Sequence, residues 1–119
     1  MQSKVITKYI RVTPLKARRV VDFVLGKPVD EAIATLSFSN YSISRPLSKA
    51  ISSAAANLKM KPEGISLDDN DILVKEVRFD KGPSWPKRYR AGARGRAKPY
   101  VKRTCHLTVV VETLNKNRR

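Results

Sequence analysis

Residues 81–111 contain no Asp or Glu, and this stretch limits what the chain can fold into more than any other feature of its sequence. Nine Lys and Arg residues occur in it, with Gly, Pro and aromatic residues between them. All nine cations lie in residues 81–103, so this part of the chain repels itself and cannot bury a core. It becomes ordered where a polyanion supplies the missing negative charge, because each cation that neutralises a phosphate releases a condensed counterion. RNA is therefore the first partner that the sequence predicts.

The composition of the whole chain agrees with this interpretation. Against 10 Asp and Glu, 25 Lys and Arg give the 119 residues a formal net charge of +15 and a pI near 10.5. This length fits one domain. We expect a globular body at residues 1–79 and 104–119, and an extended basic hairpin at residues 80–103.

Three segments have the pattern of β-strands. Residues 5–12 alternate between two sets of side chains with a period of two, and residues 72–79 and 104–113 are rich in branched and aromatic residues. In the second segment Lys75 interrupts the apolar face. The core-facing positions that we expect on the second and third strands are Leu73, Val77, Phe79, Leu107, Val109 and Val111.

Three helices are predicted between the strands. The first begins with Thr13 as N-cap and Pro14 at the first helical position, and ends at Gly26. The second runs from residue 28 to residues 37–40, and the third from residues 44–46 to 61. Their apolar positions recur at helical spacing: Ala17, Val20, Val21, Val24, Val29, Ala32, Ile33, Leu36, Leu47, Ala50, Ile51, Ala54, Ala55 and Leu58.

If the strands at 72–79 and 104–113 pair antiparallel, residues 80–103 connect them. A hairpin loop usually has two to five residues, so a connection of this length suggests a function. Extended at roughly 3.3 Å per residue, its two arms would project about 35 to 40 Å from the body. We expect Gly92 and Gly95 near the tip, where the backbone is tight, left-handed or closely approached.

The sequence contains no pattern of a secretory signal, a membrane span, an enzyme or a metal site. There is no apolar run of the required length, and Cys105 is the only cysteine. Cys105 and His106 are neighbours on a strand and point to opposite faces, so they cannot act together as nucleophile and base. We expect Cys105 to pack as a small hydrophobic residue and His106 to cap the strand or contact RNA backbone. The aspartates at 68–71 lack the spacing of a calcium loop and predict a turn. We expect no cofactor and no metal.

Three separated blocks carry a resemblance to a known family. The runs FDKGPS at residues 79–84, RGRA at 94–97 and KRTCHLTVVV at 102–111 resemble large-subunit ribosomal protein twenty-two of the bacterial and organellar type. The similarity extends to RVTPLKAR at 11–18 and SAAAN at 53–57, and so covers nearly the whole chain. The positions that fit the family's pattern are Lys87, Ala93, Gly95, Arg96, His106, Leu107, Val109 and Val111. Gly92 departs from it, because the family usually has Arg or His there.

Together with the predicted elements, the resemblance implies an α+β fold, in which three helices pack on a small antiparallel three-stranded sheet and a long extended β-hairpin loop protrudes from it. It also implies a structural role in the large ribosomal subunit, with the body near the exit of the polypeptide tunnel. The hairpin would run through large-subunit rRNA and line the tunnel with its tip, at Arg90, Ala91, Gly92, Ala93 and Arg94. The implied partners are this rRNA, neighbouring large-subunit proteins and the nascent polypeptide, without a membrane and without a homo-oligomer. The ribosome would be that of a bacterial cytoplasm, a plastid or a mitochondrion.

The side chains expected to bind rRNA are of two kinds. Lys and Arg would neutralise phosphates, and the aromatic residues would stack on unpaired bases. On the first helix they are Lys16, Arg18 and Arg19. In the hairpin they are Lys81, Trp85, Lys87, Arg88, Tyr89, Arg90, Arg94, Arg96, Lys98, Tyr100, Lys102 and Arg103.

Two other classes of function fit less well. A helix-turn-helix DNA-binding protein would use the helices at 28–37 and 45–61. The polar face of the later helix, however, has little positive charge for a recognition helix, since it offers mainly Ser48, Lys49, Ser52, Ser53 and Asn57. A protein that lies on anionic membranes would need cations opposite a bulky apolar helical face, whereas here they lie in a Gly- and Pro-containing loop.

Overall fold

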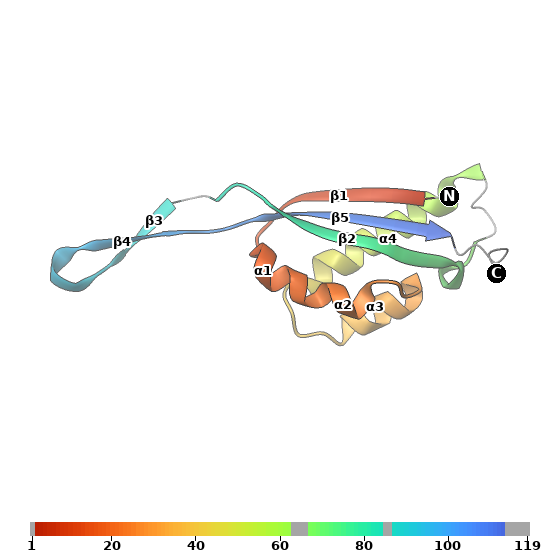
Figure 1. Cartoon of the computed structure of the whole chain (residues 1–119), viewed down its shortest axis with the longest axis horizontal. Helices are drawn as coiled ribbons and strands as arrows, with labels where there is room; N and C mark the ends of the chain where they lie inside the picture. The colour runs from red at the N-terminus through yellow and green to blue at the C-terminus, as the bar shows by residue number, and fades with distance from the viewer. Residues whose placement is uncertain (1, 63–66, 85–86, 114–119) are drawn as a thin grey trace.

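The computed structural model describes residues 2–62, 67–84 and 87–113, with only the backbone of Lys87 and Arg88. It has the predicted α+β fold, in which helices cover one face of a three-stranded antiparallel sheet (Figure 1). The molecule is elongated, with principal extents of 68 × 25 × 22 Å. No helix in the described part of the chain has the length and apolar character needed to span a membrane.

The sheet has the order β1, β5, β2. Its strands are β1 (Gln2–Ile10), β5 (Cys105–Thr113) and β2 (Ile72–Lys81), and both neighbours of β5 run antiparallel to it. Val109 of β5 pairs with Val5 on one side and Val77 on the other. The antiparallel pairing of the second and third predicted strands is thus confirmed, and β2 continues two residues beyond its predicted end.

The expected core face of β2 is wrong at its first position. Leu73 was expected to share a face with Val77 and Phe79, but Ile72 and Val74 are buried instead. The register against β5 shifts between Val74 and Glu76, which is a β-bulge. A bulge inserts one residue and reverses the alternation of faces, so a strict period of two fails across it.

The first predicted helix is interrupted. It consists of α1 (Pro14–Ala17), a 3₁₀ turn at Arg18–Val20 and α2 (Val21–Val24). Two β-branched residues, Val20 and Val21, meet at the interruption, and such side chains crowd the preceding helical turn. Thr13 is the N-cap as predicted, although its side chain makes no capping hydrogen bond, and Gly26 has the expected positive φ, at 78°.

The other two helices build most of the core. They are α3 (Val29–Ser37) and α4 (Ser44–Met60), and α4 lies against β1 and β5. Leu47, Ile51 and Leu58 of α4 are fully buried. The turn Asp69–Asp71 precedes β2, where Asp68 and Asp71 cap each other's backbone N–H groups, so the predicted turn in this acidic cluster is confirmed.

Beyond the sheet, the chain between β2 and β5 extends away from the helices, to the left in Figure 1. Here β3 (Lys87–Ala91) and β4 (Ala97–Val101) form a separate two-stranded antiparallel sheet, closed by a 3₁₀ turn at Ala93–Gly95. We call residues 80–103 the hairpin, β3 with β4 the ribbon, and the rest of the chain the body.

Candidate nucleic-acid interface

The hairpin leaves the body through a closely packed neck. The N–H of Gly82 donates to the carbonyl of Thr104 at 2.9 Å, and the hydroxyl of Thr104 donates to the carbonyl of Pro83 at 2.7 Å. A Cβ on Gly82 would lie 2.5 Å from that hydroxyl oxygen. These hydrogen bonds hold the two arms together where the body ends, and Thr104 is only 2% exposed there.

Tyr9 and His106 support the neck on the open face of the sheet. The Tyr9 N–H donates to Nδ1 of His106 at 3.2 Å, and their rings meet edge to face. Tyr9 has a positive φ of 60°, at the bulge where β1 shifts register against β5. Cys105, next to His106, is fully buried, as expected for a residue on the opposite face. Burial raises the pKa of its thiol above the ordinary value.

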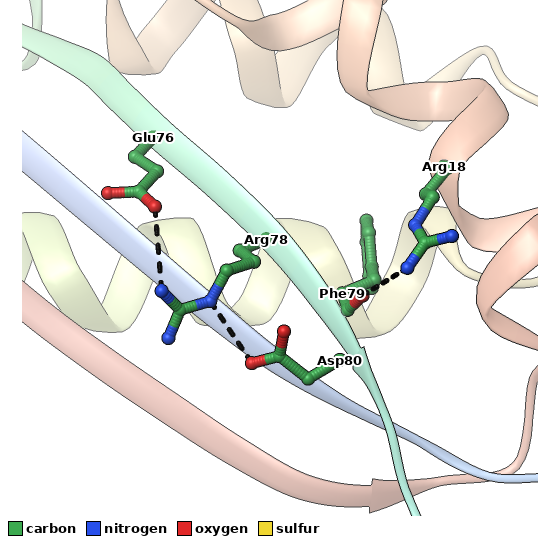
Figure 2. A network of polar contacts seen from close by, with 5 residues as sticks. All are labelled: Arg18, Glu76, Arg78, Phe79 and Asp80. Carbon is green, nitrogen blue, oxygen red and sulfur yellow. Dashed lines mark hydrogen bonds and ion pairs between the residues drawn. The ribbon is translucent and has the colours of Figure 1, made fainter.

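Two cations of the body near the neck, Arg18 and Arg78, contact other groups of the protein (Figure 2). Arg18 donates from Nη2 to the carbonyl oxygen of Phe79 at 3.1 Å, and so joins the helical segment to the edge of β2. Arg78 lies between two carboxylates, with Nε 3.0 Å from Asp80 and Nη1 3.9 Å from Glu76. The open face of the sheet is therefore close to electrically balanced at this point.

The ribbon has two chemically different faces. In its register Arg90 pairs with Lys98, while Tyr89 pairs with Pro99 and Ala91 with Ala97. Because alternate residues of a strand point to opposite faces, Arg90, Lys98 and Tyr100 share one face. The described side chains of the other face, including Val101, carry no charge. The described cationic side chains of the ribbon, Arg90 and Lys98, thus lie on one face.

The described cations of the ribbon and its tip have no carboxylate partners. Arg90, Arg94, Arg96 and Lys98 are exposed, and the ion pairs of the described residues all involve cations of the body. Exposed, unpaired cations that lie close together attract a polyanion, and the expected gain comes from counterion release.

The backbone geometry of the tip accounts for the glycines at positions 92 and 95. Gly92 donates its N–H to the carbonyl of Arg96 at 2.6 Å, and a Cβ on Gly92 would lie 2.7 Å from that oxygen. Gly95 has a φ of 71° and Arg94 one of 57°, so both occupy the left-handed region. Both expectations for the tip glycines are confirmed. An Arg or His in place of Gly92 would require this turn to shift.

The structure places the residues that the sequence singles out on two parts of the molecule, the first helical segment and the hairpin. Lys16 and Arg19 are exposed on the first helical segment, and Lys81 ends β2. Lys87 and Arg88 lie in β3, and Lys102 and Arg103 are exposed between β4 and the neck. Trp85 lies outside the described residues. Sequence analysis missed the neck residues Gly82 and Thr104, because a hydrogen bond between distant strands has no local signal.

No group of three or more His, Cys, Asp or Glu side chains in the described parts of the chain has the arrangement of a metal site. The described surface of the hairpin has exposed cations and aromatic rings, which are groups that can contact phosphates and stack on unpaired bases.

Comparisons with known proteins point in the same direction. Residues 5–112 match the family described as Ribosomal protein L22p/L17e. The chain is 45% identical over 113 residues to the large ribosomal subunit protein uL22 of Bifidobacterium animalis subsp. lactis, covering 93% of this chain and 94% of that protein. The protein of the same name from Bifidobacterium longum is 43% identical over 113 residues, with the same coverage.

Proposed function

Because the chain belongs to the ribosomal protein L22p/L17e family, and is therefore a structural, non-enzymatic constituent of the large ribosomal subunit, we propose that its hairpin binds large-subunit rRNA. The observation that carries this proposal is the row of exposed, carboxylate-free cations on the ribbon and its tip. In this role the protein links rRNA segments that its body and hairpin reach together, and so supports assembly of the subunit.

The body contributes fewer rRNA contacts than the hairpin in this proposal. Lys16 and Arg19 are exposed cations of the first helical segment and contact rRNA there. Arg18 has a second role, since its guanidinium also holds Phe79 at the base of the hairpin. The neck fixes the direction in which the hairpin enters the RNA.

The tip of the hairpin lines the polypeptide exit tunnel, at Arg90, Ala91, Gly92, Ala93 and Arg94. The proposal for the tip rests on the family and on the distance that the ribbon extends from the body (Figure 1). The partners of the chain are large-subunit rRNA, neighbouring large-subunit proteins and the nascent polypeptide, and we expect no homo-oligomer. Since the named relatives are bacterial, we assign it to a bacterial ribosome.

Salt dependence of binding tests the proposal directly. Each phosphate that a side chain neutralises contributes roughly 0.7 to 0.9 to the slope of log K against log salt. Replacing Arg94 and Arg96 by Ala should therefore flatten the slope for a large-subunit rRNA transcript by up to about two units. The matched control is Lys75→Ala with Arg78→Ala, which removes the same charge from cations that are paired with carboxylates. Equal slopes for the two double variants would contradict the proposed interface.

Sedimentation tests the proposal at the level of the particle. The tagged chain should co-migrate with the large subunit in a sucrose gradient and stay bound through a high-salt wash. The variant that lacks residues 82–103 should be lost in that wash, because most of its charge contacts are gone. Recovery of the intact chain with DNA or lipid in place of the subunit would favour one of the two rival classes.

A further inference from the structure

Arg90 and Tyr100 contact each other on the cationic face of the ribbon. The guanidinium carbon of Arg90 lies 4.6 Å from the centroid of the Tyr100 ring. Arg90 is in β3 and pairs directly with Lys98, so Tyr100 in β4 is its diagonal neighbour across the strands. The ring is thus engaged by a guanidinium within the protein, which changes the role expected of Tyr100 as an independent platform for a base.

The chemistry of the guanidinium suggests what this contact does. The group is planar and weakly hydrated on its faces, and its N–H donors lie in its plane. If the guanidinium stacks with one face on the Tyr100 ring, its other face is free to receive a flat ligand, since Arg90 is exposed. Stacking of an unpaired base on an Arg guanidinium is a common mode of RNA recognition. The in-plane donors meanwhile stay available to phosphate oxygens.

The surrounding charges restrict the ligand. Lys98 lies on the same face beside Arg90, and neither cation is paired with a carboxylate. A carboxylate partner would hold the guanidinium by its edge through two hydrogen bonds, and none of the described residues does so. A flat group placed here therefore meets two cations, which suits a nucleotide because its ribose carries both the flat base and a negatively charged phosphate.

We propose that Arg90 and Tyr100 form a stacking site for one unpaired RNA base, in the order Tyr100, Arg90, base. Lys98 neutralises a phosphate of the same strand. Tyr100 is a positioning residue, which acts by holding the guanidinium flat, and its hydroxyl is not required. This inference rests on the proposed binding of rRNA by the hairpin.

A double-mutant cycle on the full chain tests the stack. Arg90→Lys keeps the charge but removes the planar group, and Tyr100→Val removes the ring from a strand that favours valine. Since stacking of one base changes affinity substantially, each variant should bind a large-subunit rRNA transcript about 5- to 10-fold more weakly. The double variant should lose no more than either single variant, because both changes break the same stack. The salt slope should stay unchanged, since no charge is removed.

Two control variants separate the stack from a general loss of aromatic surface. Tyr100→Phe keeps the ring and should bind like the wild type. Tyr89 lies on the other face of the ribbon, opposite Pro99, and is 69% exposed. The factors by which Tyr89→Val and Arg90→Lys each weaken rRNA binding should therefore multiply in the double variant. All these positions lie outside the core, and circular dichroism should show the same folded body in each variant.

A pair of probes separates base from phosphate. The wild type should prefer a short oligoadenylate to an abasic ribose-phosphate oligomer of equal length and charge. Arg90→Lys and Tyr100→Val should reduce that preference and leave binding of the abasic oligomer unchanged.

The stack would be overturned if the losses of affinity from Arg90→Lys and Tyr100→Val multiplied in the double variant. It would also be overturned if Tyr100→Phe weakened binding as much as Tyr100→Val. These outcomes would leave rRNA binding by the hairpin intact. If the wild-type chain itself failed to bind the transcript, the proposed function would fail, and the stacking site with it.

Discussion

The body and the hairpin are stabilised in different ways. Every buried hydrophobic side chain among the described residues belongs to the body, where helices and sheet enclose a common core. The hairpin has nine of the 25 Lys and Arg residues but only one carboxylate, and its ribbon is a two-stranded sheet. An isolated two-stranded ribbon is marginally stable in water. We therefore expect the body to fold alone and the proposed rRNA contact to stabilise the hairpin, so stability and binding should respond to changes in different regions.

The largest effect should follow from removing the hairpin. If a short turn replaces residues 82–103, β2 and β5 still pair up to Lys81 and Cys105, so the body should fold with a midpoint of unfolding close to that of the whole chain. The replacement removes eight Lys and Arg residues. If four to eight of them neutralise phosphates, the salt slope of rRNA binding falls by roughly three to seven units. Thermal unfolding and filter binding measure the two properties, and a body that failed to fold would show that the regions are not independent.

A cavity in the core should affect stability alone. Leu47 is fully buried in α4, so Leu47→Ala should lower the free energy of unfolding by about 2 to 5 kcal/mol. The matched change in the ribbon is Val101→Ala, at a position that is 37% exposed, and should cost less than about 0.5 kcal/mol. Urea denaturation gives both values. Similar losses at the two positions would contradict a core that is confined to the body.

A change at the neck should have an intermediate effect, because the neck belongs to both regions. Thr104→Val removes the hydroxyl that donates to Pro83 and should cost about 0.5 to 1.5 kcal/mol. Hydrogen exchange should also become faster at the Gly82 amide, which donates to the Thr104 carbonyl. Thr104→Ser keeps the donor and serves as the control. Unchanged exchange in Thr104→Val would mean that the side chain does not hold the arms together.

The smallest effect concerns Cys105. Burial raises the pKa of its thiol in the folded state above the ordinary 9.0, so the folded state retains this proton more strongly than the unfolded state. The resulting contribution to stability is fully present below the ordinary pKa and is lost as pH rises through the folded value. Denaturation at pH 8 and above pH 9 should reveal the decrease, and Cys105→Ala should lack this component. At pH 8 the native thiol should also react more slowly with iodoacetamide than the unfolded one.

Local patterns predicted most of the elements but failed where the backbone is irregular. The helical spacing of Leu47, Ile51 and Leu58 identified α4, and the branched residues around Val109 identified β5. The face of Leu73 was wrong because a bulge near Lys75 reverses the alternation. A bulge depends on the pairing of two distant strands, so a single strand's pattern does not contain it.

In the candidate site too, the sequence predicted which residues are involved but not the contacts between distant elements. Charge and composition identified the cations of the hairpin, since a run of Lys and Arg without Asp or Glu can be read directly from the sequence. The contact of Arg18 with Phe79 and that of Arg90 with Tyr100 were not predicted. Both join residues on different elements, and their existence depends on register and on the direction of each side chain.

The sequence alone determined that this chain has a modest core and a separate cationic segment, because burial of apolar groups and repulsion between like charges follow from which residues are present and in what order. Tertiary structure decided which cations remain available. The pairing of β3 with β4 places Arg90 and Lys98 on one face, and the folding of the body engages Arg18 and Arg78. The physical reason is that side-chain contacts form between elements, and only the folded register brings their atoms within a few ångströms of each other.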